Sequence, residues 1–281
     1  SIQQEDKDEA LVTSQKDKSE HALNELSSVK AQTNIVGEKK RKTFNTTIYF
    51  VKKGLEHVTP SGHQEHPFRL ELVRKELAMF YDSEGDKVKV DSEAGSMSIN
   101  WIESSTAVSI TDCLRVHEYA YLRDLKRKCL EGEKFLDTDT HLCKESWECA
   151  RQAAGATIRA VDAVLCGDTR NAFCIVRPPG HHSGPRGAVP SCHFQKRPDM
   201  CSSGFCLLNN VCIGAAYARH TFGNPRLCDR IRNASLIEKI AIIDFDIHDG
   251  NGTAAIVRNL VPHKEKLPLP PSWPMMEYES Y

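Results

Sequence analysis

The stretch "AFCIVRPPGHHSG" (Ala172–Gly184) decides the fold of this chain. It joins a short apolar run to a loop that holds two adjacent histidines, His181 and His182. The run is continuous rather than alternating, which is typical of a strand covered on both faces, as in a parallel sheet. Ligands of such sheets collect beyond the carboxyl ends of the strands, where these histidines fall. The histidines are therefore candidates for acid–base chemistry, against the alternative of a polar loop that happens to hold histidine.

A second stretch of the same kind is "IAIIDFDIHDGNGT" (Ile240–Thr253). Its first residues predict another covered strand, and polar, glycine-rich sequence follows at the carboxyl end. In an extended segment alternate side chains share one face, so Asp244, Asp246 and His248 are expected to project together. A carboxylate and an imidazole on one face suit a divalent metal of the zinc or iron type. A solvated edge strand is the alternative, and the preceding apolar run argues against it.

Helical segments separate the two predicted strands and precede them. Their apolar residues recur at helical spacing, and the predicted helices are Pro67–Tyr81, Thr111–Leu130, Lys144–Leu165 and Gly204–His220. Strands that alternate with helices predict the α/β class. We therefore expect a parallel sheet flanked by helices on both faces.

The composition excludes several classes of partner. The chain has 281 residues, 40% of them hydrophobic, and a formal net charge of -1. Such a balance gives no bulk attraction to nucleic acid or to an anionic membrane, so we expect neither as a partner. No apolar run approaches the ~20 residues of a membrane helix. The 11 cysteines are scattered, several within apolar segments, which predicts a reduced, intracellular protein.

The first 45 residues differ in character from the remainder of the chain. Residues 1–45 are rich in charged and polar residues and poor in aromatic ones, which predicts a disordered extension before a domain over residues 46–281. The extension includes "EKKRK" (Glu38–Lys42), which is either a nuclear import signal or simply solvated charge. We expect the nucleus or the cytoplasm as the location.

Three motifs carry a resemblance to a known family. "RPPGHHSG" (Arg177–Gly184), "GFCLLNN" (Gly204–Asn210) and "DFDIHDGNGT" (Asp244–Thr253), in this order, resemble the zinc-dependent histone deacetylases, and most of all their class II branch. The resemblance runs from about Thr46 to Thr253. It implies the arginase-like deacetylase fold and hydrolysis of the acetamide of acetyl-lysine to lysine and acetate. The implied substrate is an acetylated protein, either a histone or another protein, and the implied partner is a corepressor complex. The implied context is the regulation of chromatin and transcription.

The resemblance also implies roles for the residues that match the motifs. His182 would transfer the proton and His181 would be its electrostatic partner. Asp244 would orient His181, and Asn251 would hold His182; an amide at this second position favours class II.

The metals implied are one catalytic zinc ion and a structural potassium ion. Asp246 and His248 resemble the first two zinc ligands, while Asp244 would face the potassium ion. A catalytic zinc usually takes three protein ligands and keeps one position open.

The substrate would contact two further segments. Gly204 and Phe205 match the wall of the channel that holds the lysine stem, and an ordinary core aromatic is the alternative for Phe205. Asp139, in "DTDT" (Asp137–Thr140), matches the rim carboxylate that accepts hydrogen bonds from the substrate backbone. Asp137 is close by and is the alternative.

The chain departs from the family pattern at two places before Thr253. The family usually reads His-His-Gly where this chain has His248, Asp249 and Gly250. We expect Asp249 to point away from the metal and to tune the site. An insertion over Pro185–Ser202 contains Cys192, His193 and Cys201, which form either a small metal knot or an exposed loop.

The third departure concerns the end of the sequence. After Asp249 there is no further aspartate to serve as the third zinc ligand, and the final residues lack the Gly-Gly-Tyr context of the family's catalytic tyrosine. Nothing in the spacing recommends His263 or Glu265 as a replacement. We expect a chain that is truncated within the domain, and weak or inactive alone. An acetylpolyamine amidohydrolase and an inactive scaffold or acetyl-lysine reader stay as alternatives.

Overall fold

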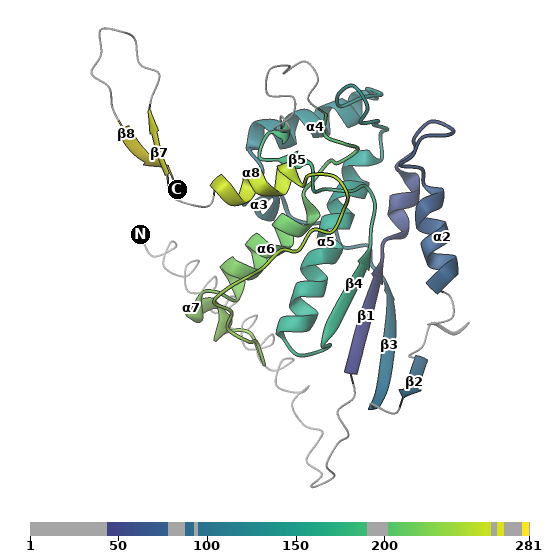
Figure 1. The fold of residues 1–281 in the computed structure, drawn as a ribbon, viewed down its shortest axis with the longest axis vertical. Helices are drawn as coiled ribbons and strands as arrows, with labels where there is room; N and C mark the ends of the chain where they lie inside the picture. Colours follow the sequence, from purple (N-terminus) through teal and green to yellow (C-terminus); the bar gives the residue numbers. More distant parts are fainter. Residues whose placement is uncertain are drawn as a thin grey trace, which may run out of the picture. The chain divides into compact units, whose positions relative to one another are not determined.

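The computed structural model describes residues 44–77, 88–92, 95–189, 202–259, 263–266 and 277–280. The chain divides into two units, Ser1–Arg41 and Lys42–Tyr281, and all of the described residues belong to the second (Figure 1). The predicted extension up to residue 43, with its basic cluster, lies outside the described residues. So do Cys192, His193 and Cys201 of the insertion.

A four-stranded sheet, in the order β2-β3-β1-β4, organises the described part of the chain. Strands β1 (Phe44–Phe50), β3 (Gly95–Glu103) and β4 (Asn171–Ile175) are parallel, and β2 (Val88–Ser92) pairs with β3 in the antiparallel sense. The strand that the sequence predicted before the histidine doublet is therefore confirmed as β4. The predicted α/β class with a parallel sheet is confirmed as well.

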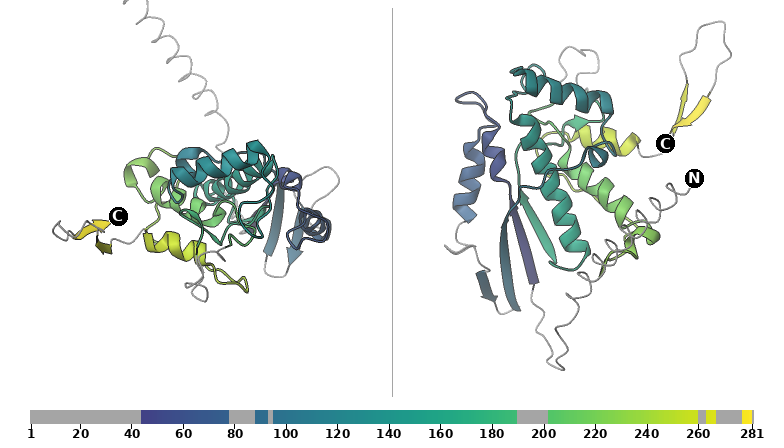
Figure 2. Two further views of the ribbon diagram at one scale, coloured as in Figure 1. Left: turned by 90° about the horizontal axis from the view of Figure 1, so that it is seen from above. Right: turned by 180° about the vertical axis from the view of Figure 1, so that it is seen from behind.

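Side chains of β1 alternate between the two faces of the sheet, and a helix covers each face. On one face lies α2 (Phe68–Glu76), with the core cluster Ile48, Phe50, Leu70, Ile99 and Ile175. On the other face lies α5 (Ser146–Leu165), with the core cluster Tyr49, Val51, Ala156 and Ala160. Figure 2 shows these two helices, dark blue and teal, on opposite sides of the strands.

The remaining elements pack around α5 or follow it. They are η1 (Lys52–Glu56), α3 (Ile110–Cys113), α4 (Tyr119–Glu131), β5 (Ser183–Gly184), β6 (Gly187–Ala188), α6 (Asn210–Thr221), α7 (Pro225–Cys228), α8 (Asn251–Asn259), β7 (His263–Lys266) and β8 (Glu277–Ser280). A third and larger core cluster joins α4, α5, α6 and α8 through Leu125, Ala150, Ile213 and Ile256. No described helix has the length and apolarity that a bilayer span requires. The nine cysteines among the described residues are all unpaired.

The helix predicted over Thr111–Leu130 is in fact two helices, α3 and α4. Between them the chain leaves helical geometry because its polar groups bond to another segment. The backbone N–H of Glu118 donates to the carbonyl of Pro185 (2.8 Å), and the side chain of His117 bonds to the carbonyl of Gly184 (2.9 Å). Tertiary hydrogen bonds outweigh the helical periodicity here.

The helix predicted over Gly204–His220 begins later, at Asn210. Asn209 is its N-cap, and its side-chain oxygen accepts from the backbone N–H of Cys212 (3.1 Å). The preceding residues form a loop, in which Gly204 and Phe205 have positive φ values of 50° and 67°. These backbone angles are incompatible with a right-handed helix.

The prediction of a strand over Ile240–Asp244 was wrong. The segment has no regular secondary structure, and it pairs with no strand among the described residues. It crosses α6 (Figure 1) above an apolar cavity of about 1100 Å³ whose lining includes Ala215, Ile240 and Ile256. Only one side of the segment is therefore covered. Its outer side chains are exposed, to 85% for Ile243, 97% for Phe245 and 93% for Ile247.

Candidate active site

The histidine loop is anchored where β4 ends. Arg177 is buried, and its Nε donates to Oε1 of Glu65 (2.6 Å) while its Nη2 donates to the carbonyl of His57 (2.6 Å). Further along, a Cβ atom on Gly180 would lie 2.3 Å from the carbonyl oxygen of Leu208. Only glycine allows the loop to approach the segment before α6 so closely.

Each histidine of the doublet has its own partner on Nδ1. Nδ1 of His181 lies 2.9 Å from Oδ2 of Asp244, and Nδ1 of His182 lies 2.7 Å from Oδ1 of Asn251. Nδ2 of Asn251 donates to the carbonyl of Val189 (2.7 Å), which turns the amide oxygen toward His182. Because these oxygens accept, both Nδ1 atoms donate, and Nε2 of each ring is left to take up a proton. The two pairings expected from the resemblance are present as hydrogen bonds.

The start of α8 packs directly against the backbone of the doublet. The N–H of Thr253 donates to the carbonyl of His181 (2.9 Å). A Cβ atom on Gly252 would lie 2.3 Å from the carbonyl carbon of His182. Gly252, in the first turn of α8, thus allows close backbone contact, and Asn251 beside it reaches the His182 ring.

Asp246 and His248 lie beside the doublet. Oδ1 of Asp246 lies 3.9 Å from Nε2 of His181, and the ring centroids of His182 and His248 are 5.8 Å apart. Nδ1 of His248 is 2.8 Å from Oδ1 of Asp246, and the hydrogen bonds from His248 lower the pKa of that carboxyl group. Both side chains are well exposed, with 48% for Asp246 and 70% for His248. The structure therefore gathers the four side chains that the sequence placed at two strand ends.

The donor chemistry of this cluster fits a zinc ion. A carboxylate and a neutral imidazole are both ordinary zinc ligands. Within the described residues no group of three or more histidine, cysteine, aspartate or glutamate side chains is arranged to hold a metal. The assignment of Asp246 and His248 as zinc ligands stays a prediction.

The protonation of His182 is set by its surroundings. Burial lowers the pKa of His182, and the neighbouring His181 and His248 lower it further, while the hydrogen bond to Asn251 acts in the opposite direction. A neutral imidazole with a free Nε2 is the form in which histidine accepts a proton.

Gly204 and Phe205, called the wall below, are consecutive residues of the loop before α6, and Gly204 lies against His182. A Cβ atom on Gly204 would lie 2.3 Å from Cδ2 of His182, so the glycine backbone contacts the imidazole. The ring of Phe205 is half-buried and makes an edge contact with His63, with centroids 4.8 Å apart. Phe205 is therefore not an ordinary core aromatic. The channel role predicted for this pair stays a prediction.

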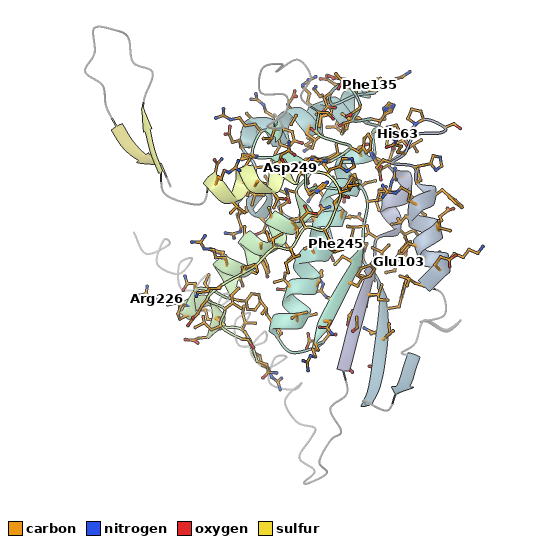
Figure 3. The ribbon with its side chains drawn as sticks, in the orientation of Figure 1. His63, Glu103, Phe135, Arg226, Phe245 and Asp249 are labelled. Carbon is orange, nitrogen blue, oxygen red and sulfur yellow. The ribbon has the colours of Figure 1, made fainter. Side chains whose placement is uncertain are left out.

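The two candidate rim carboxylates have different surroundings. Asp139 is exposed and accepts hydrogen bonds from the hydroxyl groups of Ser202 and Thr140. Asp137 is half-buried and accepts from the backbone N–H of Ser203 (2.7 Å). Asp249 is exposed on the segment that leads to α8 (Figure 3).

His117, which was not among the residues predicted from the sequence, joins three segments of the site. Its Nδ1 donates to the carbonyl of Gly184, and its Nε2 accepts from the backbone N–H of Asn209 (3.0 Å). Both ring nitrogens of a neutral histidine are thereby satisfied, and burial lowers the pKa of His117 to about 4. The available signal was a histidine inside an otherwise amphipathic helical pattern.

Comparisons with known proteins place these residues within a known domain. The histidine doublet, Asp246, His248 and Asn251 all fall within residues 63–263, which match the family model described as "Histone deacetylase domain". The match covers well over half of the chain.

Individual relatives are longer than this chain. Type-2 histone deacetylase 1 of Dictyostelium discoideum is 37% identical over 172 residues, which are 61% of this chain and 10% of that protein. Polyamine deacetylase HDAC10 of Rattus norvegicus is 38% identical over 108 residues, which are 38% of this chain and 14% of that protein. The crystal structure of the HDA15 HD domain has a TM-score of 0.57 at 24% identity and covers 76% of this chain and 51% of that one, which shows a shared fold. The chain belongs to the histone deacetylase domain family.

Proposed function

We propose that this domain serves the zinc-dependent hydrolysis of the acetamide of acetyl-lysine in proteins, with release of acetate. The observation that carries the proposal is the histidine doublet, in which Asp244 and Asn251 each hold one Nδ1, beside Asp246 and His248. Family membership supports a deacetylase, and the amide at position 251 supports a class II type.

The metal would be held by Asp246 and His248. Zinc, when bound, polarises a carbonyl group and lowers the pKa of a bound water molecule. The carboxylate of Asp244, which already orients His181, is the proposed contact for a structural potassium ion.

The residues of the chain itself would supply proton transfer and substrate positioning. At Nε2, His182 accepts the proton that the attacking water loses, and it later donates a proton to the leaving lysine amine. His181 and Asp244 stabilise the positive charge that His182 carries between these two transfers. Gly204 and Phe205 line the path of the lysine stem and exclude water from the reacting amide.

The test is release of acetate from an acetyl-lysine peptide by the zinc-loaded chain. Replacing a general acid–base group lowers the rate by about 10²- to 10⁴-fold, so His182→Ala should do so. His220→Ala is the matched control, because His220 is an exposed histidine at the end of α6. Measurable acetate release at equal rates by the His182→Ala variant and the unchanged chain would contradict the proposal.

Two other functions have a specific observation in their favour. The likeness to a polyamine deacetylase favours an acetylpolyamine as substrate. An acetyl-lysine reader without turnover is the second alternative; the chain offers Asp246 and His248 as candidate zinc ligands, and a catalytic zinc usually takes three. Faster hydrolysis of acetylspermidine than of the peptide would select the first, and peptide binding without acetate release would select the second.

A further inference from the structure

The wall beside His182 has a backbone conformation that needs support. Gly204 and Phe205 are consecutive residues with left-handed φ values. A residue with a side chain rarely adopts such values, because its Cβ atom approaches the backbone too closely. The conformation of Phe205 must therefore be stabilised by contacts outside its own loop.

Asp137 provides the first of these contacts. Its Oδ2 accepts from the backbone N–H of Ser203 (2.7 Å). Its Oδ1 accepts from the backbone N–H groups of Thr140 (3.0 Å) and Asp139 (3.3 Å). One carboxylate thus fixes the turn in which it lies and joins this turn to the loop that holds Gly204.

Thr140 provides the second contact. It is fully buried, and its hydroxyl oxygen accepts from the backbone N–H of Phe205 (3.2 Å). The bonds to Ser203 and Phe205 lie on either side of Gly204. Together they hold the Gly204 backbone against the ring of His182, where a Cβ atom would have no space.

The turn that carries Asp137 is itself well ordered by hydrogen bonds. The N–H of Leu136 donates to the carbonyl of Thr140 (2.8 Å), and Nζ of Lys128 in α4 donates to the carbonyl of Leu136 (3.3 Å). A row of four rings also joins the turn to the wall: Phe135, His141, His63 and Phe205, with successive centroids 4.4, 4.8 and 4.8 Å apart (Figure 3 labels Phe135 and His63).

The charge of Asp137 suits this role. Burial raises the pKa of its carboxyl group, but the hydrogen bonds from Ser203, Thr140 and Asp139 outweigh burial and hold the pKa below its usual value. The group is therefore an ionised acceptor at neutral pH, and hydrogen bonds to ionised acceptors are the stronger kind.

We propose that Asp137 is a positioning residue that shapes the substrate-binding wall of Gly204 and Phe205. Asp139, which is exposed, is left as the carboxylate that can reach the backbone of a bound substrate. This division of roles rests on the function proposed above, because that function makes the wall the place where the acetyl-lysine stem binds.

Hydrogen exchange tests the positioning contact without any substrate. In Asp137→Asn one amide oxygen can still accept from Thr140, but the NH₂ group then faces the N–H of Ser203, donor against donor. Exchange measured by mass spectrometry on the segment over residues 202–207 should become about 10- to 100-fold faster, as expected for the loss of a charge-assisted hydrogen bond. Asp168→Asn, at an exposed aspartate between α5 and β4, is the control with the same charge change and should leave this exchange rate unchanged.

Peptide binding tests the consequence for the wall. The probe is a fluorescein-labelled acetyl-lysine peptide, with its unacetylated form as the reference, followed by anisotropy. Asp137→Asn should weaken binding of the acetylated peptide at least fivefold, and Asp168→Asn should not. Thr140→Val, which keeps the shape of the side chain and removes its hydroxyl acceptor, should weaken binding in the same direction and serves if Asp137→Asn fails to fold.

The outcomes separate the positioning role from the function on which it rests. Unchanged exchange in both Asp137→Asn and Thr140→Val would overturn the positioning role. Faster exchange with unchanged peptide binding would overturn the link to the substrate wall. If the unchanged chain does not prefer the acetylated peptide, the proposed function fails, while the exchange result still decides whether Asp137 holds the loop.

Discussion

At the scale of the residue, glycines decide how closely the backbone approaches the candidate site. Gly180, Gly204 and Gly252 each lie where a Cβ atom would come within 2.3 Å of another atom. Two of these contacts involve His182, one through its ring and one through its backbone. The position of the proton-transfer candidate is therefore set by residues without side chains, and its hydrogen bond to Asn251 sets the ring orientation.

Replacing Gly204 by alanine should distinguish the effect of its contact with the His182 ring from the effect of backbone strain. Gly204→Ala introduces a Cβ atom 2.3 Å from the His182 ring, at a φ of +50°. Gly167→Ala is the matched control, because Gly167 also has a positive φ (+78°) but has nothing within 4 Å of the added atom. Both variants should lose about 1 kcal/mol of unfolding free energy through strain.

Only the Gly204→Ala variant should bind the acetyl-lysine peptide more weakly, because only there must the imidazole or the wall move. Urea unfolding and peptide anisotropy measure the two effects. Equal losses of peptide binding in the two variants would show that strain alone accounts for the effect.

At the scale of the element, close packing of α5 depends on a glycine in its middle. A Cβ atom on Gly155 would lie 2.0 Å from the carbonyl oxygen of Thr106, which is a backbone atom and cannot rotate away. In α6, a Cβ atom on Gly214 would meet the side-chain methyl group of Thr157 at 2.5 Å. Helix propensity alone predicts that alanine stabilises both positions by about 1 kcal/mol.

At Gly155 we expect the clash with the backbone to outweigh helix propensity, so that alanine destabilises the protein. Gly155→Ala should lose about 2 kcal/mol or more of unfolding free energy, as overpacked positions do. Gly214→Ala should stay within about 1 kcal/mol of the unchanged chain, because a side chain can move and propensity offsets the contact. Chemical denaturation of the two variants checks this order. A stabilised Gly155→Ala variant would mean that the backbone of residue 106 yields easily.

The elements that sequence analysis predicted correctly are those whose own residues determine them. The alanine-rich segment formed α5, where local pattern and burial agree. The apolar run before His181 formed β4, but β4 is an edge strand of the described sheet and Phe173 on it is 52% exposed, so the expectation of a strand covered on both faces was wrong. Three elements depended on distant contacts that the sequence does not display. His117 interrupts a predicted helix through hydrogen bonds to residues 184 and 209. The loop at Gly204 depends on its contact with His182. The apolar run from Ile240 needs neighbouring strands to pair with before it can form a strand.

The candidate site was predicted better than the strand that was expected to carry it. Alternation along residues 244–248 predicted Asp244, Asp246 and His248 on one side, and all three lie near the doublet in the structure. The exposed alternation of Ile243, Phe245 and Ile247 is the other side of the same pattern. The polar side chains come together although residues 241–245 form no strand and residues 246–248 lie in a bend.

At the scale of the whole molecule, buried neutral histidines make stability depend on pH. Burial, with the charge of Arg177, lowers the pKa of His57 to about 3, and burial lowers that of His117 to about 4. In the unfolded chain both should titrate near pH 6.5. Between these values the unfolded state binds more protons than the folded state, so the free energy of unfolding falls as the pH falls.

The expected slope is up to about 1.4 kcal/mol per pH unit for each histidine below pH ~6.5. Glu65 opposes part of it, because burial raises its pKa and the folded state then binds an additional proton in acid. Urea midpoints at pH 7 and pH 5 measure the net effect. His117→Gln, whose amide can both donate and accept, should remove the contribution of one histidine, up to about 1.4 kcal/mol per pH unit, from this slope. Equal midpoints for the unchanged chain at the two pH values would contradict the account.

Asp246, His248 and the histidine doublet are proposed to form one metal-dependent site. Titration with Co²⁺, which reports its ligands through visible absorption, measures metal binding at this site. We predict one equivalent of Co²⁺ with a spectrum that changes when the acetyl-lysine peptide is added. This signal should be lost in the double variant Asp246→Asn/His248→Ala and retained in Asp249→Asn. Equal binding of Co²⁺ by the double variant and the unchanged chain would contradict the claim.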